Sequence, residues 1–369
     1  MRMDRRGLLA GAVAAFAVPR AASAALAEPS AAARDRIGEL AAGYLREFPV
    51  PGLSVAFAQG GKVGYAGAFG LADRNAGTKL VTTHRFRLAS VSKPVTAVAI
   101  FTLVDAGRLS LDARVLGPSG LLGEPGGPIP AGSRLREITV HHLLTHTAGG
   151  WPNNATDPMF MPPLLSMDDV IAAGLRVPLA NAPGTAYAYS NFGYCLLGRA
   201  IEKVAGKPYD AYVREAVLAP ARAAGMAIAG NTLAERMPDE VRYHGQDGQD
   251  PYAINVRRMD AHGGWTATAS DVALFADAAG PPLLSAAATK AMVAGSAAEP
   301  GYACGWRINA AGNRWHGGSL AGTATLMVRT ARGMCWAGLT NTRQRNDGMA
   351  AALDRLLWAM VRSVPEWRA

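Results

Sequence analysis

The chain has 369 residues, of which 50% are hydrophobic and 18% are charged. This balance is typical of a globular protein with a sizeable core, and the length allows one large domain or two intimately joined ones. The formal net charge of +9 comes mostly from arginines scattered along the chain without an interleaved aromatic stripe, which argues against a nucleic-acid-binding module.

Residues 1–24 have the pattern of an export signal that is removed from the mature protein. The pair Arg5-Arg6 resembles a twin-arginine signal, and an apolar run, Gly7–Val18, follows it. This run is too short to anchor the chain stably in a membrane. We therefore expect cleavage after Ala24 and a periplasmic or secreted bacterial protein. The alternative is a frayed N-terminal helix of a cytosolic protein.

Periodicity predicts a helix, a strand pair, an extended segment and a second helix in the N-terminal part of the chain. The two strands are joined by a Gly60-Gly61 turn of the hairpin kind. The second helix begins at a Ser-x-x-Lys motif and tolerates Pro94 in its first turn. In chain order, the predicted elements are 32–48, 52–58, 62–69, 85–88 and 90–106.

The strand signal disappears between about residues 109 and 261, where short helices alternate with Pro- and Gly-rich loops. We expect helices at 139–145, 167–174, 190–205 and 208–218. A helix with Ser270-Asp271 as its N-cap signal follows, then strands at 302–308, 322–330 and 333–340 and a final helix at 348–362. This order predicts one α/β layer built from residues 30–108 and 262–369, with a helical domain (109–261) inserted between them.

Ser90-Val91-Ser92-Lys93 contains the only lysine of the chain that lies three residues after a serine. On a helix, residues three apart share a face, so the Ser90 hydroxyl would have the Lys93 amine beside it as a base. Lys93 must be partly neutral for that role, which burial can produce. The motif alone is weak evidence, and a serine-acyl site also needs a proton shuttle and an oxyanion hole.

Tyr189-Ser190-Asn191 is the only Tyr-x-Asn in the chain, and it lies in a loop just before a predicted helix. Tyr189 could relay a proton between Ser90, Lys93 and a leaving group, because nearby cations ease deprotonation of a phenol. Asn191 could bind the substrate carbonyl and position Lys93. In the alternative interpretation, Tyr189 is a buried core aromatic residue and Asn191 caps the helix.

His316-Gly317-Gly318 precedes a predicted strand, and its glycines would let a substrate approach the backbone closely. The backbone N–H of Ser319, together with that of Ser90, would then form the oxyanion hole. His262-Gly263-Gly264 is a competing His-x-Gly motif, which we rank second because it leads into a predicted helix rather than a strand.

Ser-x-x-Lys, Tyr-x-Asn and His-x-Gly, in this order, resemble the serine β-lactamase-related superfamily, closest to class C β-lactamases, D-alanyl-D-alanine peptidases and family VIII esterases. The segments Leu143–Gly149, Gly263–Asp271 and His316–Gly322 also resemble segments of that group. The resemblance covers nearly all of residues 28–369. It implies a β-lactamase/transpeptidase-like fold, in which N- and C-terminal helices flank an antiparallel sheet and a helical domain is inserted.

The resemblance also implies roles for individual residues. Ser90 would be the nucleophile, Lys93 and Tyr189 the acid/base pair, and Asn191, His316, Gly318 and Ser319 would bind the substrate. Class C β-lactamases carry Lys-Thr-Gly where this chain has His316-Gly317-Gly318, so a cation and a hydroxyl that would grip a substrate carboxylate are missing. This departure favours a carboxylesterase or a D-amino-acid-type peptidase over a β-lactamase.

The predicted substrate is a small ester, amide or peptide, with no cofactor and no stable membrane anchor, and the oligomeric state stays open. A slowly acylating or non-catalytic sensor of penicillin or cell-wall peptide on the same fold is the alternative function. No metal site is expected, although His142 and His146 have helical i, i+4 spacing. Cys195 is expected to be a buried thiol, and a pairing of Cys304 with Cys335 is left open.

Overall fold

The computed structural model describes residues 25–246, 248–344 and 348–367. The predicted export signal, 1–24, lies outside the described residues. Within the described ranges, no helix is both long enough and apolar enough to cross a membrane.

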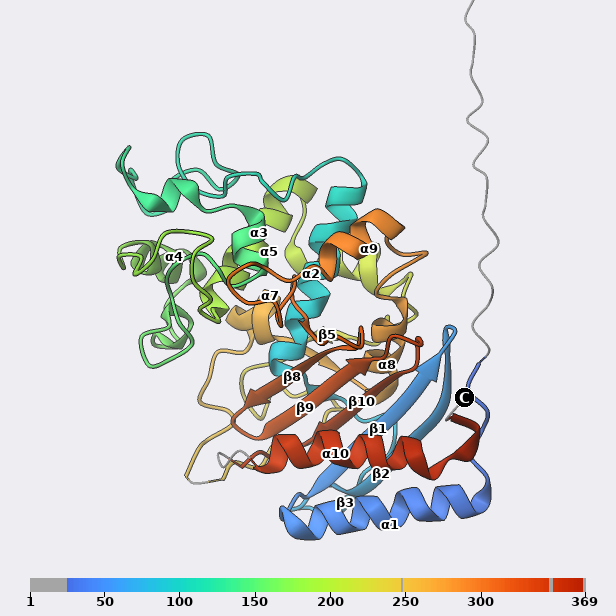
Figure 1. The fold of residues 1–369 in the computed structure, drawn as a ribbon. Coiled ribbons are helices and arrows are strands. Elements are labelled where there is room, and N and C mark those ends of the chain that lie inside the picture. Colours follow the sequence, from blue (N-terminus) through green and yellow to red (C-terminus); the bar gives the residue numbers. More distant parts are fainter. Residues whose placement is uncertain (1–24, 247, 345–347, 368–369) are drawn as a thin grey trace, which may run out of the picture.

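A seven-stranded sheet forms the base of the structure, and all of its strand pairs are antiparallel. Its strand order is β3-β2-β1-β10-β9-β8-β7, so the N-terminal strand β1 lies beside β10 from the other end of the chain (Figure 1). The predicted α/β layer is confirmed. Its strands are β1 (Gly52–Gln59), β2 (Lys62–Asp73), β3 (Thr78–Lys79), β7 (Arg307–Ile308), β8 (Arg314–Leu320), β9 (Thr323–Arg329) and β10 (Cys335–Thr340).

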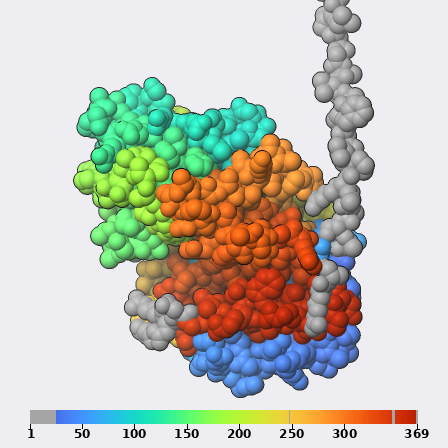
Figure 2. Space-filling view, in the orientation of Figure 1, coloured from blue at the N-terminus to red at the C-terminus, as the bar shows by residue number. Residues whose placement is uncertain are grey.

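Helices cover both faces of this sheet. On one face lie α1 (Ala31–Glu47) and α10 (Gly348–Ser363), which contact each other and appear as neighbouring blue and red surfaces in Figure 2. The other face is covered by α8 (Ala269–Ala278). Because β1 is buried on both faces, its sequence is almost continuously apolar instead of alternating. The β1–β2 turn is formed by Gly60 and Gly61, whose φ angles of 62° and 77° suit a tight hairpin.

The helical part packs around α2 (Ser92–Asp105), in which every residue from Ser92 to Phe101 is buried. The short helices α3 (Val140–Leu144), α4 (Met167–Leu175), α6 (Tyr209–Val213), α7 (Asp260–Gly263) and α9 (Ala286–Met292) and the longer α5 (Asn191–Ala205) surround or extend from it. A small second sheet, in the order β4-β6-β5, joins Phe86–Arg87, Trp265–Ala267 and Ala227–Ile228.

Several predicted boundaries were wrong. Helix α8 is capped by Thr268, whose hydroxyl accepts from the backbone N–H of Asp271 while the Asp271 carboxylate accepts in return, so the cap lies before Ser270. Of the strand predicted at 302–308, only β7 forms. The three cysteines are all buried and free, so Cys304 and Cys335 do not pair.

Candidate active site

Ser90 lies in a tight 3₁₀ turn, Ala89–Val91, immediately before α2. We expected Ser90 to open the helix itself, but the helix begins at Ser92. Ala89 has a positive φ of 49°, a left-handed conformation that is unfavourable for a residue with a Cβ. The turn therefore presents Ser90 at the wall of a cleft instead of continuing a smooth helix.

Lys93 is completely buried and lies directly behind Ser90. Its Nζ is 3.2 Å from Ser90 Oγ, 2.7 Å from Asn191 Oδ1 and 3.1 Å from the carbonyl oxygen of His262. Burial lowers the pKa of Lys93 to about 7, against an opposing effect of the Asp157 carboxylate. A neutral amine has two N–H groups and one lone pair. Because an amide oxygen and a carbonyl oxygen can only accept, they take the two N–H groups, and the lone pair faces the Ser90 hydroxyl.

Asn191 is held in the orientation that Lys93 requires. Its Nδ2 donates to Asn153 Oδ1 over 2.9 Å and to Asp157 Oδ2 over 3.0 Å, so its Oδ1 turns toward Lys93. The α5 cap is Ser190, which excludes the alternative that Asn191 caps the helix. Sequence reasoning missed Asn153 and the buried Asp157, because they come from an irregular loop without a motif.

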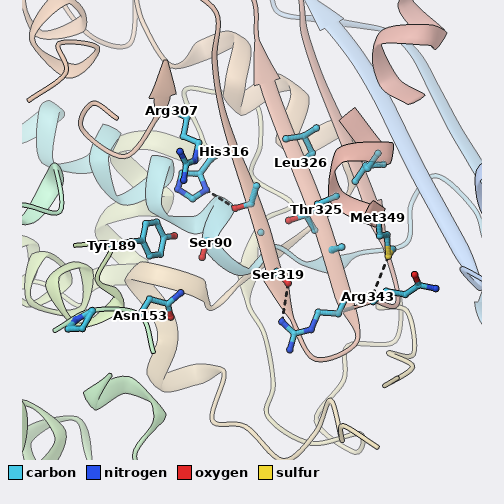
Figure 3. Close-up of a pocket in the computed structure, with 17 residues that line it drawn as sticks. Ser90, Asn153, Tyr189, Arg307, His316, Ser319, Thr325, Leu326, Arg343 and Met349 are labelled. Carbon is cyan, nitrogen blue, oxygen red and sulfur yellow. Dashed lines mark hydrogen bonds between the residues drawn. The ribbon is translucent and has the colours of Figure 1, made fainter. Parts of the chain in front are cut away.

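The Tyr189 hydroxyl points toward Ser90 (Figure 3). The Tyr189 ring packs against His146, with the Lys93 Nζ 4.6 Å from its centroid. Burial raises the pKa of Tyr189, although we expected neighbouring cations to ease its deprotonation. At neutral pH the phenol therefore keeps its proton, and Lys93 is the group able to accept one.

A buried hydrogen-bond chain runs from α5 to β8 through His146, Tyr302 and His316. His146 Nδ1 accepts from the backbone N–H of Ser190, so the hydrogen is on Nε2, which donates to the Tyr302 hydroxyl over 3.1 Å. His316 Nδ1 must donate to the Gly317 carbonyl, so its Nε2 accepts from Tyr302 over 3.0 Å. Burial lowers the pKa of His316 to about 3 and that of His146 well below its usual range. Both imidazoles are therefore neutral.

This chain predicts opposite tautomers for the two histidines. In NMR spectra of the ¹⁵N-labelled protein, His146 is expected as the Nε2–H form and His316 as the Nδ1–H form between pH 5 and 8. Tyr302→Phe removes the hydroxyl that is hydrogen-bonded to both histidines and should change both sets of ring signals. Tyr187→Phe is the matched control, because the Tyr187 hydroxyl is buried near His146 and has no hydrogen-bond partner in the described part of the chain. Titration of His316 near its ordinary pKa in the unaltered protein would contradict the assignment.

Gly318 lies on β8 where this strand touches the Ser90 turn. A Cβ at Gly318 would lie 2.1 Å from the Leu88 carbonyl oxygen, 2.3 Å from Thr325 Oγ1 and 3.2 Å from the Ala89 Cβ. We expected this glycine to make room for substrate. The space is instead taken by the turn itself, which the Thr325 hydroxyl binds by donating to the Leu88 carbonyl over 2.9 Å. The His316 motif lies within a strand and does not precede one.

An open cleft of about 760 Å³ runs along β8. Beyond Trp315, β8 pairs with β9 alone in the described part of the chain, so its outer edge borders this cleft. The Ser319 hydroxyl accepts from Arg343 Nη1 over 3.0 Å, which turns this side chain away from Ser90 (Figure 3). The cleft is lined by, among others, Ser90, Asn153, Tyr189, Arg307, His316, Gly318 and Ser319.

His262, the competing histidine, contributes its carbonyl oxygen and not its ring to this region. Its motif leads into strand β6, so our reason for ranking it second was wrong. In the described ranges, no group of three or more His, Cys, Asp or Glu side chains is placed to hold a metal. His142 lies in the α3 capping box, and Trp151, Trp265 and Trp306 are buried in the core.

Three comparisons relate this chain to known proteins. It is 35% identical over 224 residues to esterase EstB of Burkholderia gladioli, covering 58% of this chain and 54% of that one. The structure of SurE with D-Leu has 27% identity and a TM-score of 0.67, covering 92% of this chain and 76% of that one. D-amino acid amidase from Ochrobactrum anthropi SV3 has 19% identity and a TM-score of 0.74, covering 91% and 99%, a likeness of fold alone.

The match to a curated relative is partial, because the chain spans about half the length of esterase EstB and 38% of the next relatives. The family profile described as Beta-lactamase, in contrast, matches residues 39–358 and so covers the sheet, the helical part and every residue of the site. The chain belongs to the beta-lactamase family.

Proposed function

We propose that this protein is an exported serine hydrolase that forms an acyl-enzyme at Ser90 and hydrolyses an ester or an amide. The main support is the 3.2 Å contact between Ser90 Oγ and the amine of Lys93. Burial lowers the pKa of this amine to about 7. A hydroxyl beside a largely neutral amine is an activated nucleophile at neutral pH. The signal-like segment 1–24 supports export.

In the proposed acylation, Ser90 Oγ attacks the substrate carbonyl carbon while its proton passes to Lys93 Nζ. The backbone N–H groups of Ser90 and Ser319 bind the oxyanion. Tyr189, which keeps its proton at neutral pH, donates it to the leaving group as the C–O or C–N bond breaks, and the Lys93 ammonium restores it. In deacylation, Lys93 takes a proton from the attacking water and returns it to Ser90 Oγ as the acyl bond breaks.

The neutral state of His316 favours an ester or a D-amino-acid amide over a β-lactam. A lysine at this position would attract a substrate carboxylate with a permanent charge, whereas His316 is uncharged and engaged with Tyr302. The name of one relative agrees with this preference, since it is an esterase. We therefore propose carboxylester or D-aminoacyl amide hydrolysis, with slow turnover of β-lactams.

Intact-mass spectrometry of protein from the periplasmic fraction tests this proposal. With p-nitrophenyl esters and a fluorophosphonate, the Ser90→Ala variant is expected to lose turnover and covalent labelling. Ser92→Ala is the matched control, because Ser92 lies in the same segment and its hydroxyl accepts from the Trp265 backbone. The same spectra report whether the chain is cut after Ala24.

A parallel panel of D-aminoacyl amides and nitrocefin ranks the substrate classes. Labelling in the Ser90→Ala variant would overturn the nucleophile assignment. A single burst of labelling without further turnover would replace the hydrolase proposal with the sensor alternative. Nitrocefin turnover at a kcat/KM near the diffusional limit would contradict the proposed preference.

A further inference from the structure

A second cavity, of about 280 Å³, lies at the end of β8 and β9 and shares no lining residue with the catalytic cleft. The residues of interest in its wall are Gly280, Thr289, Arg314 and Arg329. Arg314 and Arg329 face each other as partners in the β8–β9 register. Like charges directly opposite each other on antiparallel strands are destabilising unless an anion compensates for them.

Only one of these two arginines has a carboxylate partner among the described residues. Arg329 Nη1 is 3.3 Å from Asp277 Oδ1, and it also donates to backbone carbonyls at the end of α8. Arg314 is 6% exposed, donates to the Ala279 carbonyl and lies with its guanidinium 5.1 Å from the centroid of the Trp306 ring. A guanidinium has five N–H donors, so one carbonyl leaves most of its capacity unused.

The positive charge of Arg314 is not balanced by the described groups around it. Burial, together with the charge of Arg329, lowers the pKa of Arg314 to about 9, so it stays protonated at neutral pH. The partial negative charge at the end of α8 compensates for part of this cost. A bound anion would compensate for the rest, because a buried charge is costly unless it is paired.

A hydroxyl donor converges with Arg314 on one point of the cavity. Thr289 Oγ1 is buried and has no hydrogen-bond partner among the residues that the structure describes. A methyl group added at Gly280 would lie 3.6 Å from Arg314 Nη2, 3.7 Å from Thr289 Cγ2 and 3.9 Å from Thr289 Oγ1, so both side chains border the same small volume. A charged donor and a hydroxyl around a small space are the contacts that an oxyanion accepts.

We propose that this cavity binds a small oxyanion, either a carboxylate or a phosphate group, through Arg314 and Thr289. The site is independent of the acyl-enzyme chemistry, since no group in it touches Ser90 or Lys93. It lies two residues from His316 along the same strand, which makes β8 the element shared by the two sites.

Thermal unfolding in the presence of sodium phosphate or sodium acetate tests the proposal, with sodium chloride at matched ionic strength as the reference. For an anion with a Kd of about 1 mM, roughly 50 mM ligand should raise Tm by about 3 °C over chloride. A rise with phosphate alone assigns a phosphate group, and a rise with acetate assigns a carboxylate. No rise with either anion would overturn the proposal.

Three variants separate this site from general salt effects. Thr289→Val and Gly280→Ala should reduce the anion-dependent rise, and Arg314→Gln should abolish it. Arg332→Gln, which removes an exposed charge from the next turn, should leave the rise unchanged. Should Arg314→Gln fail to fold, the other two variants still decide the question. An undiminished rise in both Thr289→Val and Gly280→Ala would place the anion elsewhere.

Discussion

Replacing Lys93 by methionine is expected to lower kcat/KM for an activated ester by about 10²–10⁴-fold, the usual contribution of a general base. The methionine side chain suits the buried site, but it cannot accept the proton of Ser90. Lys93→Arg is expected to be similarly inactive, because a guanidinium stays protonated and cannot act as a base. Steady-state kinetics on one p-nitrophenyl ester compare the variants.

The pH dependence identifies the base. Because the neutral amine is the active form, kcat/KM should rise with pH, level off above the pKa of Lys93, which is about 7, and fall about tenfold per pH unit below it. Burial holds the pKa values of His146, His262 and His316 below this range, so the titration of these histidines does not cause the acidic limb, the fall of kcat/KM below pH 7. A limb that persists unchanged in Lys93→Met would contradict the assignment.

The Asp157 carboxylate should shift this limb in a known direction. It favours the charged form of Lys93 and so raises the pKa of that amine against the effect of burial. Asp157→Asn is therefore expected to move the limb to lower pH, while the loss of one hydrogen-bond acceptor beside Asn191 lowers the plateau. Asp168→Asn, at an exposed position on α4, is the control and should leave the limb in place.

The second large effect is expected for Gly318→Ala. The added methyl group would meet the Leu88 carbonyl and Thr325 Oγ1 at 2.1 and 2.3 Å, so β8 and the Ser90 turn must separate. A displacement of about 1 Å at a reacting group can cost roughly a hundredfold in rate, and overpacking costs about 1–3 kcal/mol of stability. We expect both losses together, measured as kcat/KM and as the free energy of unfolding.

The neighbouring glycine provides the matched stability control. A Cβ at Gly317 would meet nothing closer than the Thr325 carbonyl oxygen at 3.7 Å, which is an ordinary contact. Gly317→Ala should therefore leave the free energy of unfolding nearly unchanged. Equal destabilisation by the two substitutions would show that β8 merely disfavours alanine, and that the fit against the Ser90 turn is unimportant.

The sequence predicted the elements whose signals are local. The helical periodicity of α1 and α10 and the glycine turn between β1 and β2 depend on neighbouring residues alone. Strand β8 was missed because His316-Gly317-Gly318 lacks the β-branched and aromatic residues that mark strands, and tertiary contacts hold it in place.

The same distinction applies to the site. Ser90, Lys93, Tyr189 and Asn191 lie in short motifs, and the structure brings them together. Asp157 and Tyr302 were not predicted, because each acts through partners that are distant in the sequence. Asp157 binds Asn191, and Tyr302 binds both His316 and His146. The left-handed backbone conformation of Ala89 was not predictable either, because the residue there is not a glycine.

The pairing of β1 with β10 has a consequence for biosynthesis. Leu53 lies opposite Thr340, so the centre of the sheet cannot close until almost the whole chain has left the ribosome. Contacts between such distant residues carry a large loop-closure cost and are associated with slow folding. Until then, the apolar strand β1 lacks its neighbour β10 and is not covered by α10. The nascent protein therefore has a long interval in which this largely apolar strand needs protection from aggregation.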